Sequence, residues 1–201
     1  MLTKLKLTGI LIIILFGNTT VLSASQDIKG DVLEFGYYQA FDELARSKNL
    51  SSPSGYIRKG GNVQLVKQSV EIPNIQGLLF GFQFRLSGYA KTVDQAWLRL
   101  VVKHPLMIRP NGSRAEGYSY PISLRVKNGA IEDKSGYKLD KKFEMVEGEW
   151  VFQYWDKDKV LIEQKFTLRA PTKADHKLIL AAKQKIAKKE KLQQKKQHEA
   201  K

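Results

Sequence analysis

The chain of 201 residues contains no cysteine. This absence excludes disulfide bonds, a lipid-modified cysteine and a cysteine nucleophile. A domain without disulfides depends on its hydrophobic core for stability, and 42% hydrophobic with 10% aromatic residues is sufficient for one large core. If the chain is exported, this composition fits a bacterial envelope protein better than a small secreted eukaryotic one.

Sequence patterns for catalysis are also scarce. Two of the three histidines, His176 and His198, lie in a lysine-rich C-terminal segment, which argues against a three-histidine metal site. No serine lies in a Gly-x-Ser-x-Gly elbow, and no GxxxxGK[ST] loop is present for phosphates. We therefore expect no metal, no cofactor and no enzyme activity. The alternative is an envelope hydrolase with paired carboxylates, Glu116 with Glu147 or Glu149.

Residues 1–25 have the pattern of a signal peptide. Lys4 and Lys6 form a basic start, an apolar run extends from Leu7 to Phe16, and small residues follow at Ser23, Ala24 and Ser25. The run is shorter than the roughly 20 apolar residues of a membrane span. We expect cleavage and a periplasmic or extracellular location, with an uncleaved N-terminal anchor as the alternative.

Apolar and polar side chains alternate in several short segments between residues 26 and 170. The clearest is Leu78 to Leu86, where Phe80, Phe82 and Phe84 share one face, as in a half-buried strand. The other segments are Asp31–Gln39, Val63–Ile72, Trp97–Lys103, Tyr118–Val126 and the two arms of Gly148–Leu168, with an edge strand expected in Tyr137–Met145. Seven or eight strands without long helical patterns predict an all-β fold, an antiparallel two-sheet sandwich.

Some positions within these strands predict irregular geometry. Gly36 predicts a bulge or a close approach of another backbone, and the apolar face of Val63 to Ile72 changes near Val66, which predicts a bulge there. In the hairpin after Gly148, the apolar faces of the two arms lie on the same side of the sheet only if each pair joins two even-numbered or two odd-numbered residues. This predicts that Trp155 pairs with Lys159 around a three-residue loop.

A long polar connection extends from Phe41 to Asn62. Its first part, AFDELARSK, is expected to form about two helical turns, and Ser51 to Gly55 and Gly60-Gly61 are turn-formers. Connections of this length inside a domain are uncommon and are usually functional or mobile. The segment is therefore a candidate for either role.

The composition changes at Pro171. Residues 171–201 contain ten lysines and three acidic residues. Ten minus three gives this segment a charge of +7, which is half of the formal net charge of +14. Alanine, lysine, glutamine, leucine and glutamate favour a helix, and Ile179 and Ile186 belong to an apolar stripe on its first three turns. We expect a basic helical or disordered tail that contacts anionic surfaces, or a solvated tail without a binding role. The lysines expected to make these contacts are Lys183, Lys185, Lys188, Lys189, Lys191, Lys195 and Lys196.

The segment from residue 104 to 120 collects the side chains that suit a binding site. We expect a loop there, with the guanidinium groups of Arg109 and Arg114 forming a pocket for an anion or carboxylate. The alternative is a structural role, in which a strand-end histidine packs and an acid pairs with an arginine. The candidate binding residues in and around this loop are His104, Arg109, Arg114, Glu116 and Tyr118.

Trp155 and Trp97 are expected to face outward, because their neighbours at odd spacing face the core. Exposed flat rings suit stacking on sugars or partner side chains, which makes a carbohydrate-binding module the second functional alternative. Burial of these rings under a loop is the structural alternative.

Four short motifs resemble an uncharacterised bacterial family known as a domain of unknown function. They are His104-Pro105 after a strand, Pro110-Asn111-Gly112 in a loop, Glu116-Gly117-Tyr118 entering the next strand, and Gly148-Glu149-Trp150 opening the last hairpin. The resemblance covers Leu33 to Leu168 and implies an immunoglobulin-like β-sandwich. It implies no catalytic residues.

These observations favour an exported, non-enzymatic binding or interaction module. We expect three parts: a signal peptide (1–25), a β-sandwich domain (26–170) and a basic tail (171–201). The expected partners are a protein or a glycan, with an anionic lipid or polysaccharide surface near the tail. Nucleic acid is not expected as a partner, because export separates the protein from it.

Overall fold

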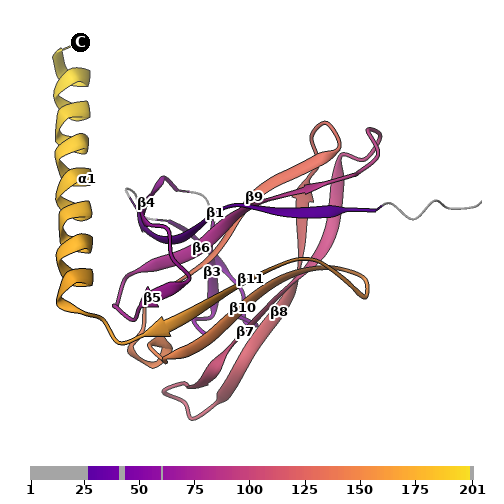
Figure 1. Cartoon of the computed structure of the whole chain (residues 1–201), viewed down its shortest axis with the longest axis horizontal. Coiled ribbons are helices and arrows are strands. Elements are labelled where there is room, and N and C mark those ends of the chain that lie inside the picture. Colours follow the sequence, from indigo (N-terminus) through magenta and orange to yellow (C-terminus); the bar gives the residue numbers. More distant parts are fainter. Residues whose placement is uncertain (1–26, 41–43, 60, 200–201) are drawn as a thin grey trace, which may run out of the picture.

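The structure is a computed structural model that describes residues 27–40, 44–59 and 61–199, so the expected signal peptide lies outside the described residues. Two sheets lie face to face, and one long helix stands at one end of them (Figure 1). One sheet has the order β4 (Val63–Lys67), β1 (Lys29–Ala40), β6 (Leu79–Ser87) and β9 (Ala130–Lys138). The other has the order β5 (Glu71–Pro73), β11 (Lys159–Arg169), β10 (Gly148–Asp156), β7 (Gln95–Ile108) and β8 (Arg114–Arg125). The all-β sandwich predicted from the sequence is confirmed.

The core lies between the inner faces of the two sheets. Phe80, near the start of β6, is fully buried and meets the rings of Trp150, Phe152 and Phe166 edge-on, at centroid distances of 5.3 to 5.9 Å. Edge-to-face contacts of this kind add to the stabilisation from area burial. The predicted alternation along β6 is therefore correct, and its aromatic face closes the sandwich.

More strands form than the seven or eight expected: the described residues contain eleven. The connection after β1 is a hairpin of β2 (Ala45–Lys48) and β3 (Tyr56–Lys59), so the helix expected from AFDELARSK is wrong for Ala45 to Lys48. Residues 41–43 lie outside the described residues. The segment from Val63 to Ile72 divides between the sheets, and β5 pairs with β11 in parallel. Pairing of β2 with β3 overrides the weak helical propensity of Ala45 to Lys48.

The predicted turn between β10 and β11 is wrong, although the parity argument behind it is correct. Trp150 pairs with Phe166 and Tyr154 with Ile162, as the shared apolar face requires. Trp155 then pairs with Val160 instead of Lys159, so Leu161 is the extra residue of a β-bulge. The bulge shifts the register by one residue, which permits a two-residue turn without moving polar side chains into the core.

Irregularities in β1 and β4 partly follow the predictions. Gly36 lies so close to the backbone of Lys67 that a Cβ atom would be 2.1 Å from its carbonyl oxygen, and Val66 is the extra residue opposite Tyr37 and Tyr38. Both predictions are confirmed. Leu33, which simple alternation would place on one face with Phe35 and Tyr37, is 55% exposed, because the register of β1 on β6 shifts at this residue.

Two segments expected as other structures are corrected. Residues 104–108 and 114–120 are strand, so the predicted loop is the end of the β7–β8 hairpin and the turn occupies residues 109–113. The edge strand expected in Tyr137 to Met145 lies earlier, as β9, and a 3-10 helix, η1 (Lys142–Glu144), follows it.

The basic tail forms one helix, α1 (Lys173–Glu199), that packs against β1 and β4. A capping box starts it: the Thr172 amide donates to the Asp175 carboxylate at 2.8 Å, and the Asp175 amide donates to Thr172 Oγ1 at 3.2 Å. Ile179 and Ile186 are buried, so the predicted stripe docks. None of the described helices is long and apolar enough to cross a membrane.

Candidate functional site

A cavity of about 760 Å³ lies on the side of the sandwich where the outer strands β8 and β9 face each other. β8 ends one sheet and β9 ends the other, and the two strands are not hydrogen-bonded neighbours. The cavity lies within the range of about 300 to 1,000 Å³ that is usual for small-molecule sites. The sandwich is therefore open along this side.

Several tyrosine side chains line the cavity. Tyr118 and Tyr120 come from β8, Tyr137 from β9 and Tyr154 from β10. The rings of Tyr118 and Tyr120 are parallel within 2°, at a centroid distance of 6.2 Å, and Tyr137 lies 6.4 Å from Tyr118. Alternation explains the arrangement, because residues two apart on β8 share the inner face. The result is a row of aromatic faces at the cavity.

The tyrosine hydroxyl groups stay protonated at neutral pH. Burial raises the pKa of Tyr120 to about 12, and it also raises the pKa values of Tyr118, Tyr137 and Tyr154. Tyr118 and Tyr120 donate no hydrogen bond to any group in the described part of the chain. These two hydroxyl groups are available to a ligand as donors and acceptors.

Asp133 is the acidic side chain on the inner face of β9. Asp133 pairs with Phe84 of β6 and is half-buried. Ser135, two residues further along β9, lies on the same face. One carboxylate oxygen accepts the backbone N–H of Lys134 at 2.8 Å. Burial raises the pKa of Asp133, because the charged form loses hydration.

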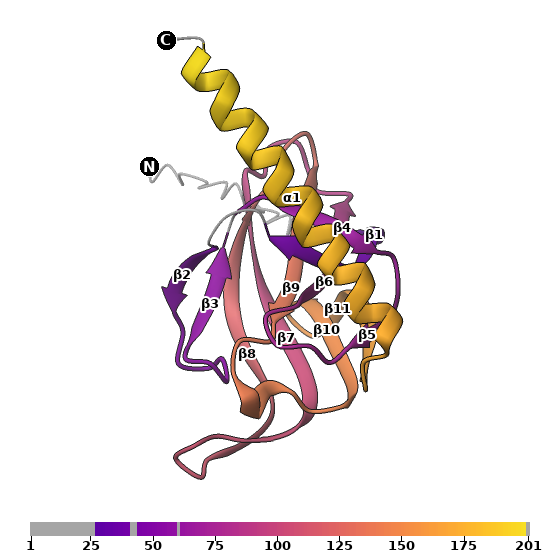
Figure 2. The same ribbon diagram turned by 90° about the vertical axis from the view of Figure 1, so that its left-hand side faces the viewer.

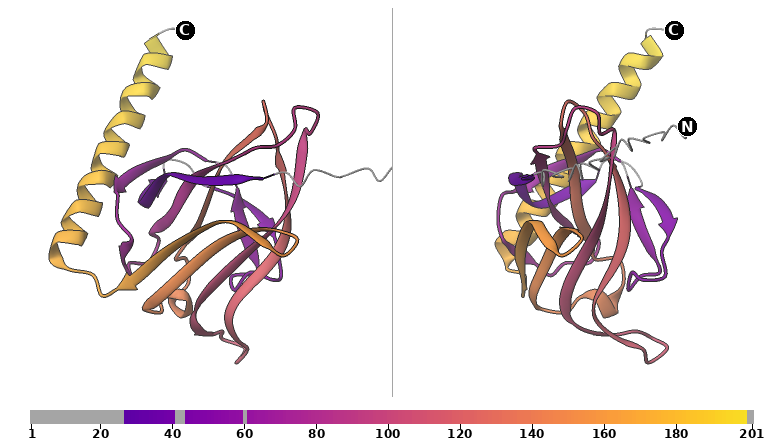
Figure 3. Two further views of the ribbon diagram at one scale, coloured as in Figure 1. Left: turned by 45° about the vertical axis from the view of Figure 1, so that its right-hand side comes forward. Right: turned by 90° about the vertical axis from the view of Figure 1, so that its right-hand side faces the viewer.

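The β2–β3 hairpin flanks the open side of the sandwich beside β8, away from β11 (Figure 2; Figure 3, right). Arg58 of β3 donates two hydrogen bonds to Asp140 after β9, at 2.9 Å from Nε and 2.5 Å from Nη2. Tyr56 adds a third at 3.1 Å. At the hairpin turn, Arg109 Nε donates to the carbonyl of Pro53 at 3.0 Å. The hairpin is thus attached at both ends and supplies Tyr56 and Arg58 to the cavity lining.

His104 lies behind the cavity and does not reach solvent. It is 4% exposed, with its ring 5.1 Å from Trp150 and 6.2 Å from Tyr118. Its Nδ1 is 2.8 Å from the carbonyl oxygen of Pro105, and burial lowers the pKa of the ring, which is therefore neutral at pH 7. Neutral His104 supports the Tyr118 ring from the core side.

The other residues predicted between 104 and 120 do not form one pocket. Arg109 binds the hairpin turn and Ser113, whereas Arg114 and Glu116 are exposed. Among the candidates from this segment, Tyr118 is the one that lines the cavity. Of the two arginines expected to bind an anion, Arg109 donates to Pro53 and Ser113, and Arg114 is exposed.

Trp155 lies on the outer face of β10. Its Nε1 donates to Gln153 at 3.0 Å, and the guanidinium carbon of Arg99 lies 5.3 Å from the ring centroid. Trp97, on β7, is 70% exposed. Both rings face outward, as predicted, on the surface opposite to the cavity.

The lysines of α1 are exposed where their side chains are described. Lys183, Lys185, Lys188, Lys189 and Lys191 are exposed. Lys195 and Lys196 lie on the same helix, outside the part whose side chains the structure describes. In the described residues, no group of three or more His, Asp or Glu side chains is placed to hold a metal ion.

Sequence reasoning missed Asp133, Ser135, Tyr154, Arg58 and Asp140 as site residues. The signal for β3 was the unusual length of the connection after β1, which indicated a functional or mobile segment. For β9 and β10 no local signal was present, since inward tyrosines look like core residues in a strand pattern.

Comparisons with known proteins add a family. Residues 26–168 match the model of a family described as "Domain of unknown function (DUF3859)". No curated protein matches the chain. A crystal structure of an immunoglobulin-like protein from Pseudomonas aeruginosa is 24% identical, with a TM-score of 0.47, over 73% of this chain and 99% of that chain.

Two further solved structures resemble parts of the chain. One is the alkylpurine DNA glycosylase AlkC of Pseudomonas fluorescens bound to DNA, at 15% identity and a TM-score of 0.33, covering 50% of this chain and 28% of that chain. The other is a β-glucosidase of Erythrobacter marinus, at 13% identity and a TM-score of 0.34, covering 58% of this chain and 19% of that chain.

Proposed function

Because this chain belongs to the DUF3859 family, whose description names no ligand and no reaction, we propose a function from its own geometry: it is a binding module that holds a ligand in the tyrosine-lined cavity. The family and its immunoglobulin-like sandwich are those predicted from the sequence. The main support for this proposal is the cavity of about 760 Å³ between β8 and β9. Aromatic walls with a few polar groups are typical of small-ligand sites.

The module works in the cell envelope in this proposal. The support is the signal-peptide pattern of residues 1–25 and the absence of cysteine from a chain with a single large core. The cavity suits a ligand of that compartment with both an apolar and a polar part, since tyrosine offers a ring face and a hydroxyl group.

A nuclear magnetic resonance titration tests the cavity as a binding site. The probes are choline, glucosamine, N-acetylglucosamine and glycerol 3-phosphate, each at millimolar concentration. We expect at least one of them to shift the resonances of Tyr118, Tyr120 and Tyr154. Ser135→Phe fills the inner face of β9 and should abolish the shifts, whereas Ser119→Phe, on the exposed face of β8, should leave them unchanged.

Two results would overturn this proposal. One is that no probe shifts the cavity resonances. The other is that the shifts persist in a folded Ser135→Phe protein, because the ligand would then lie elsewhere. Unchanged dispersion of the amide resonances in both variants shows that the fold is retained.

A second binding surface is favoured by one observation, the 70% exposure of Trp97 beside the Arg99–Trp155 pair. Large exposed rings on a sheet face suit stacking on glycans, so carbohydrate binding at this outer face is the alternative function. The hydrolase alternative has less support, since His104 is buried and Glu116 is exposed.

The basic helix α1 adds an attachment to anionic surfaces in this proposal. Its first turns dock on the sandwich, and the following turns carry five exposed lysines within nine residues. Lysines near an anionic membrane contribute about 1 kcal/mol each. The partner surface is anionic lipid or polysaccharide, and the helix holds the cavity close to it.

A further inference from the structure

Four of the six charged side chains that line the tyrosine-lined cavity form ion pairs. Arg58 and Lys138 both pair with Asp140, at 2.5 and 3.6 Å, and Glu132 pairs with Arg85 at 3.5 Å. Asp133 differs from these residues. In the part of the chain that the structure describes, it forms no ion pair, and its one hydrogen bond comes from a backbone N–H.

An acidic side chain without a counter-charge is unfavourable in a half-buried position. Burial raises the pKa of Asp133 for this reason, and the nearby Lys134 opposes the change only in part. Lys134, the next residue on β9, is exposed and also reaches the cavity lining, but it forms no ion pair with Asp133. The inner face of β9 therefore presents a carboxylate that a cation would stabilise.

The rings next to Asp133 favour the same kind of ligand. Tyr120 and Tyr154 are close enough to Asp133 for its charge to raise their pKa values. The faces of aromatic rings carry partial negative charge and attract cations within about 6 Å of the centroid. Aromatic faces and a carboxylate around one cavity are the two elements that recognise alkylammonium groups, and neither attracts an anion.

We propose that the cavity binds an organic cation of the alkylammonium class, with the cationic group beside Asp133 and against the rings of Tyr118, Tyr120 and Tyr154. This inference rests on the proposed function, because it names the ligand class of the same cavity. The parallel rings of Tyr118 and Tyr120 contact the apolar part of the cation, and their free hydroxyl groups bind any polar substituent.

A pair of ligands with the same shape and different charge tests the inference. Choline and its neutral isostere 3,3-dimethyl-1-butanol are titrated separately into the purified protein, and resonance shifts give both affinities. We expect choline to bind at least about tenfold more tightly, since one cation–π contact and one carboxylate together exceed about 1.4 kcal/mol.

Two isosteric substitutions separate the carboxylate of Asp133 from an acidic side chain outside the cavity lining. Asp133→Asn should reduce the preference for choline to about twofold or less. Glu149→Gln, at an exposed position of β10, should leave it unchanged. Tyr120→Leu should weaken both ligands and choline more, because a ring face is lost.

The outcomes distinguish the inference from the proposed function. If the neutral isostere or a neutral sugar binds in the cavity as well as choline does, the cation inference is wrong and the binding module stands. If Asp133→Asn retains the full preference, the inference is also wrong. If none of the probes binds in the cavity, both proposals are wrong.

Discussion

Arg58 and Asp140 form an ion pair between residues 82 positions apart, with side chains that are 11% and 15% exposed. The pair connects the β2–β3 hairpin to the chain after β9, across the opening of the cavity. The carboxylate also accepts the hydroxyl group of Tyr56. Asp140 thus makes one attachment of this hairpin, and the hydrogen bond from Arg109 to Pro53 makes another.

Loss of the Asp140 carboxylate should open the hairpin locally. Asp140→Ala leaves Arg58 without its counter-charge in a mostly buried position, which is strongly destabilising. We expect hydrogen exchange of the β2 and β3 amides to become at least about tenfold faster, while the β6 amides change less. Lys138→Gln removes the weaker contact at 3.6 Å and is the control. Unchanged exchange in Asp140→Ala would show that the hairpin is held by other contacts.

Removal of the Asp133 charge should not destabilise the protein. The folded-state pKa of Asp133 is raised, so the folded protein binds a proton more readily than the unfolded chain does. Stability attributable to this group is therefore lost as the pH rises from the ordinary pKa through the raised one. We expect Asp133→Asn to have an equal or higher melting temperature at pH 7, measured by circular dichroism. A clearly lower melting temperature would indicate a structural role for the carboxylate.

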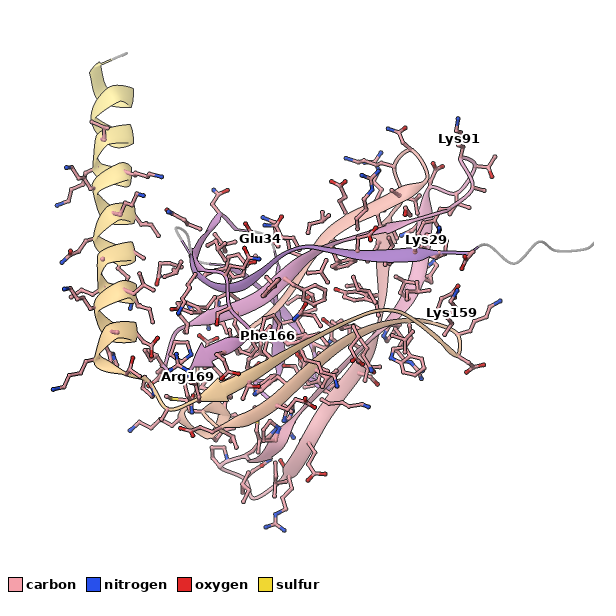
Figure 4. The ribbon with its side chains drawn as sticks, in the orientation of Figure 1. Lys29, Glu34, Lys91, Lys159, Phe166 and Arg169 are labelled. Carbon is pink, nitrogen blue, oxygen red and sulfur yellow. The ribbon has the colours of Figure 1, made fainter. Side chains whose placement is uncertain are left out.

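The start of α1 should become less stable in acid. Arg169, at the end of β11 (Figure 4), donates to Asp175 at 2.8 and 3.1 Å, and this pair lowers the pKa of Asp175 well below 3.8. A lowered folded-state pKa gives stability that is complete above about pH 4 and declines as the pH falls towards the folded-state pKa.

The pH dependence of Asp175→Asn checks this sign. Urea unfolding gives the free energy of unfolding of the native protein and of the variant at pH 7 and at about pH 2. The native protein should be much more stable than the variant at pH 7, and this difference in free energy should be smaller at about pH 2. Asp158→Asn, in the exposed turn after β10, should show no such change. A constant difference at both pH values would contradict the assignment.

Neutralisation of the α1 lysines should release the protein from anionic vesicles. A variant with glutamine at Lys183, Lys185, Lys188, Lys189 and Lys191 should bind phosphatidylglycerol vesicles at least about a hundredfold more weakly at low salt. A variant with glutamine at Lys91, Lys127, Lys141, Lys142 and Lys157 loses equal charge and should bind normally. Native binding should decrease at about 1 M salt, where the Debye length is about 3 Å. Equal weakening in both variants would point to net charge alone.

Replacement of Trp97 should separate glycan binding from stability. The ring is 70% exposed, so Trp97→Ala should change the free energy of unfolding by less than about 0.5 kcal/mol. If the outer face binds glycans, quenching of tryptophan fluorescence by soluble envelope polysaccharide is lost in Trp97→Ala and retained in Trp97→Phe after correction for the missing fluorophore. Identical titration curves for all three proteins would remove the carbohydrate alternative.

The two-sheet core was predictable because strand alternation is a local property. Phe80, Phe82 and Phe84 are all buried, and their spacing alone places them on one face. The same holds for the parity of Trp150 and Phe166, which pair as their shared apolar face requires. Local helix formers likewise predicted α1, whose composition leaves no competing strand pattern.

The candidate site was less predictable, because its residues meet through pairings that no local pattern contains. Tyr118 was identified from the sequence for its place near His104, and the structure gives it a different role beside Tyr120 and Asp133. The bulge at Leu161 was hidden for the same reason. The spacing of apolar residues requires that even-numbered residues of one arm pair with even-numbered residues of the other. It does not show at which residue a bulge shifts the register and so permits a two-residue turn.

By itself, the amino-acid sequence determined that this protein buries aromatic rows between β-sheets, lacks disulfide chemistry and ends in a basic helix. These properties follow from residue type and from periods of two and 3.6 along the chain. The tertiary structure alone decided that β8 and β9 face each other across a cavity and that Arg58 meets Asp140 beside it. Strand order and edge geometry depend on the free energy of packing residues far apart in the chain, which short-range patterns do not encode.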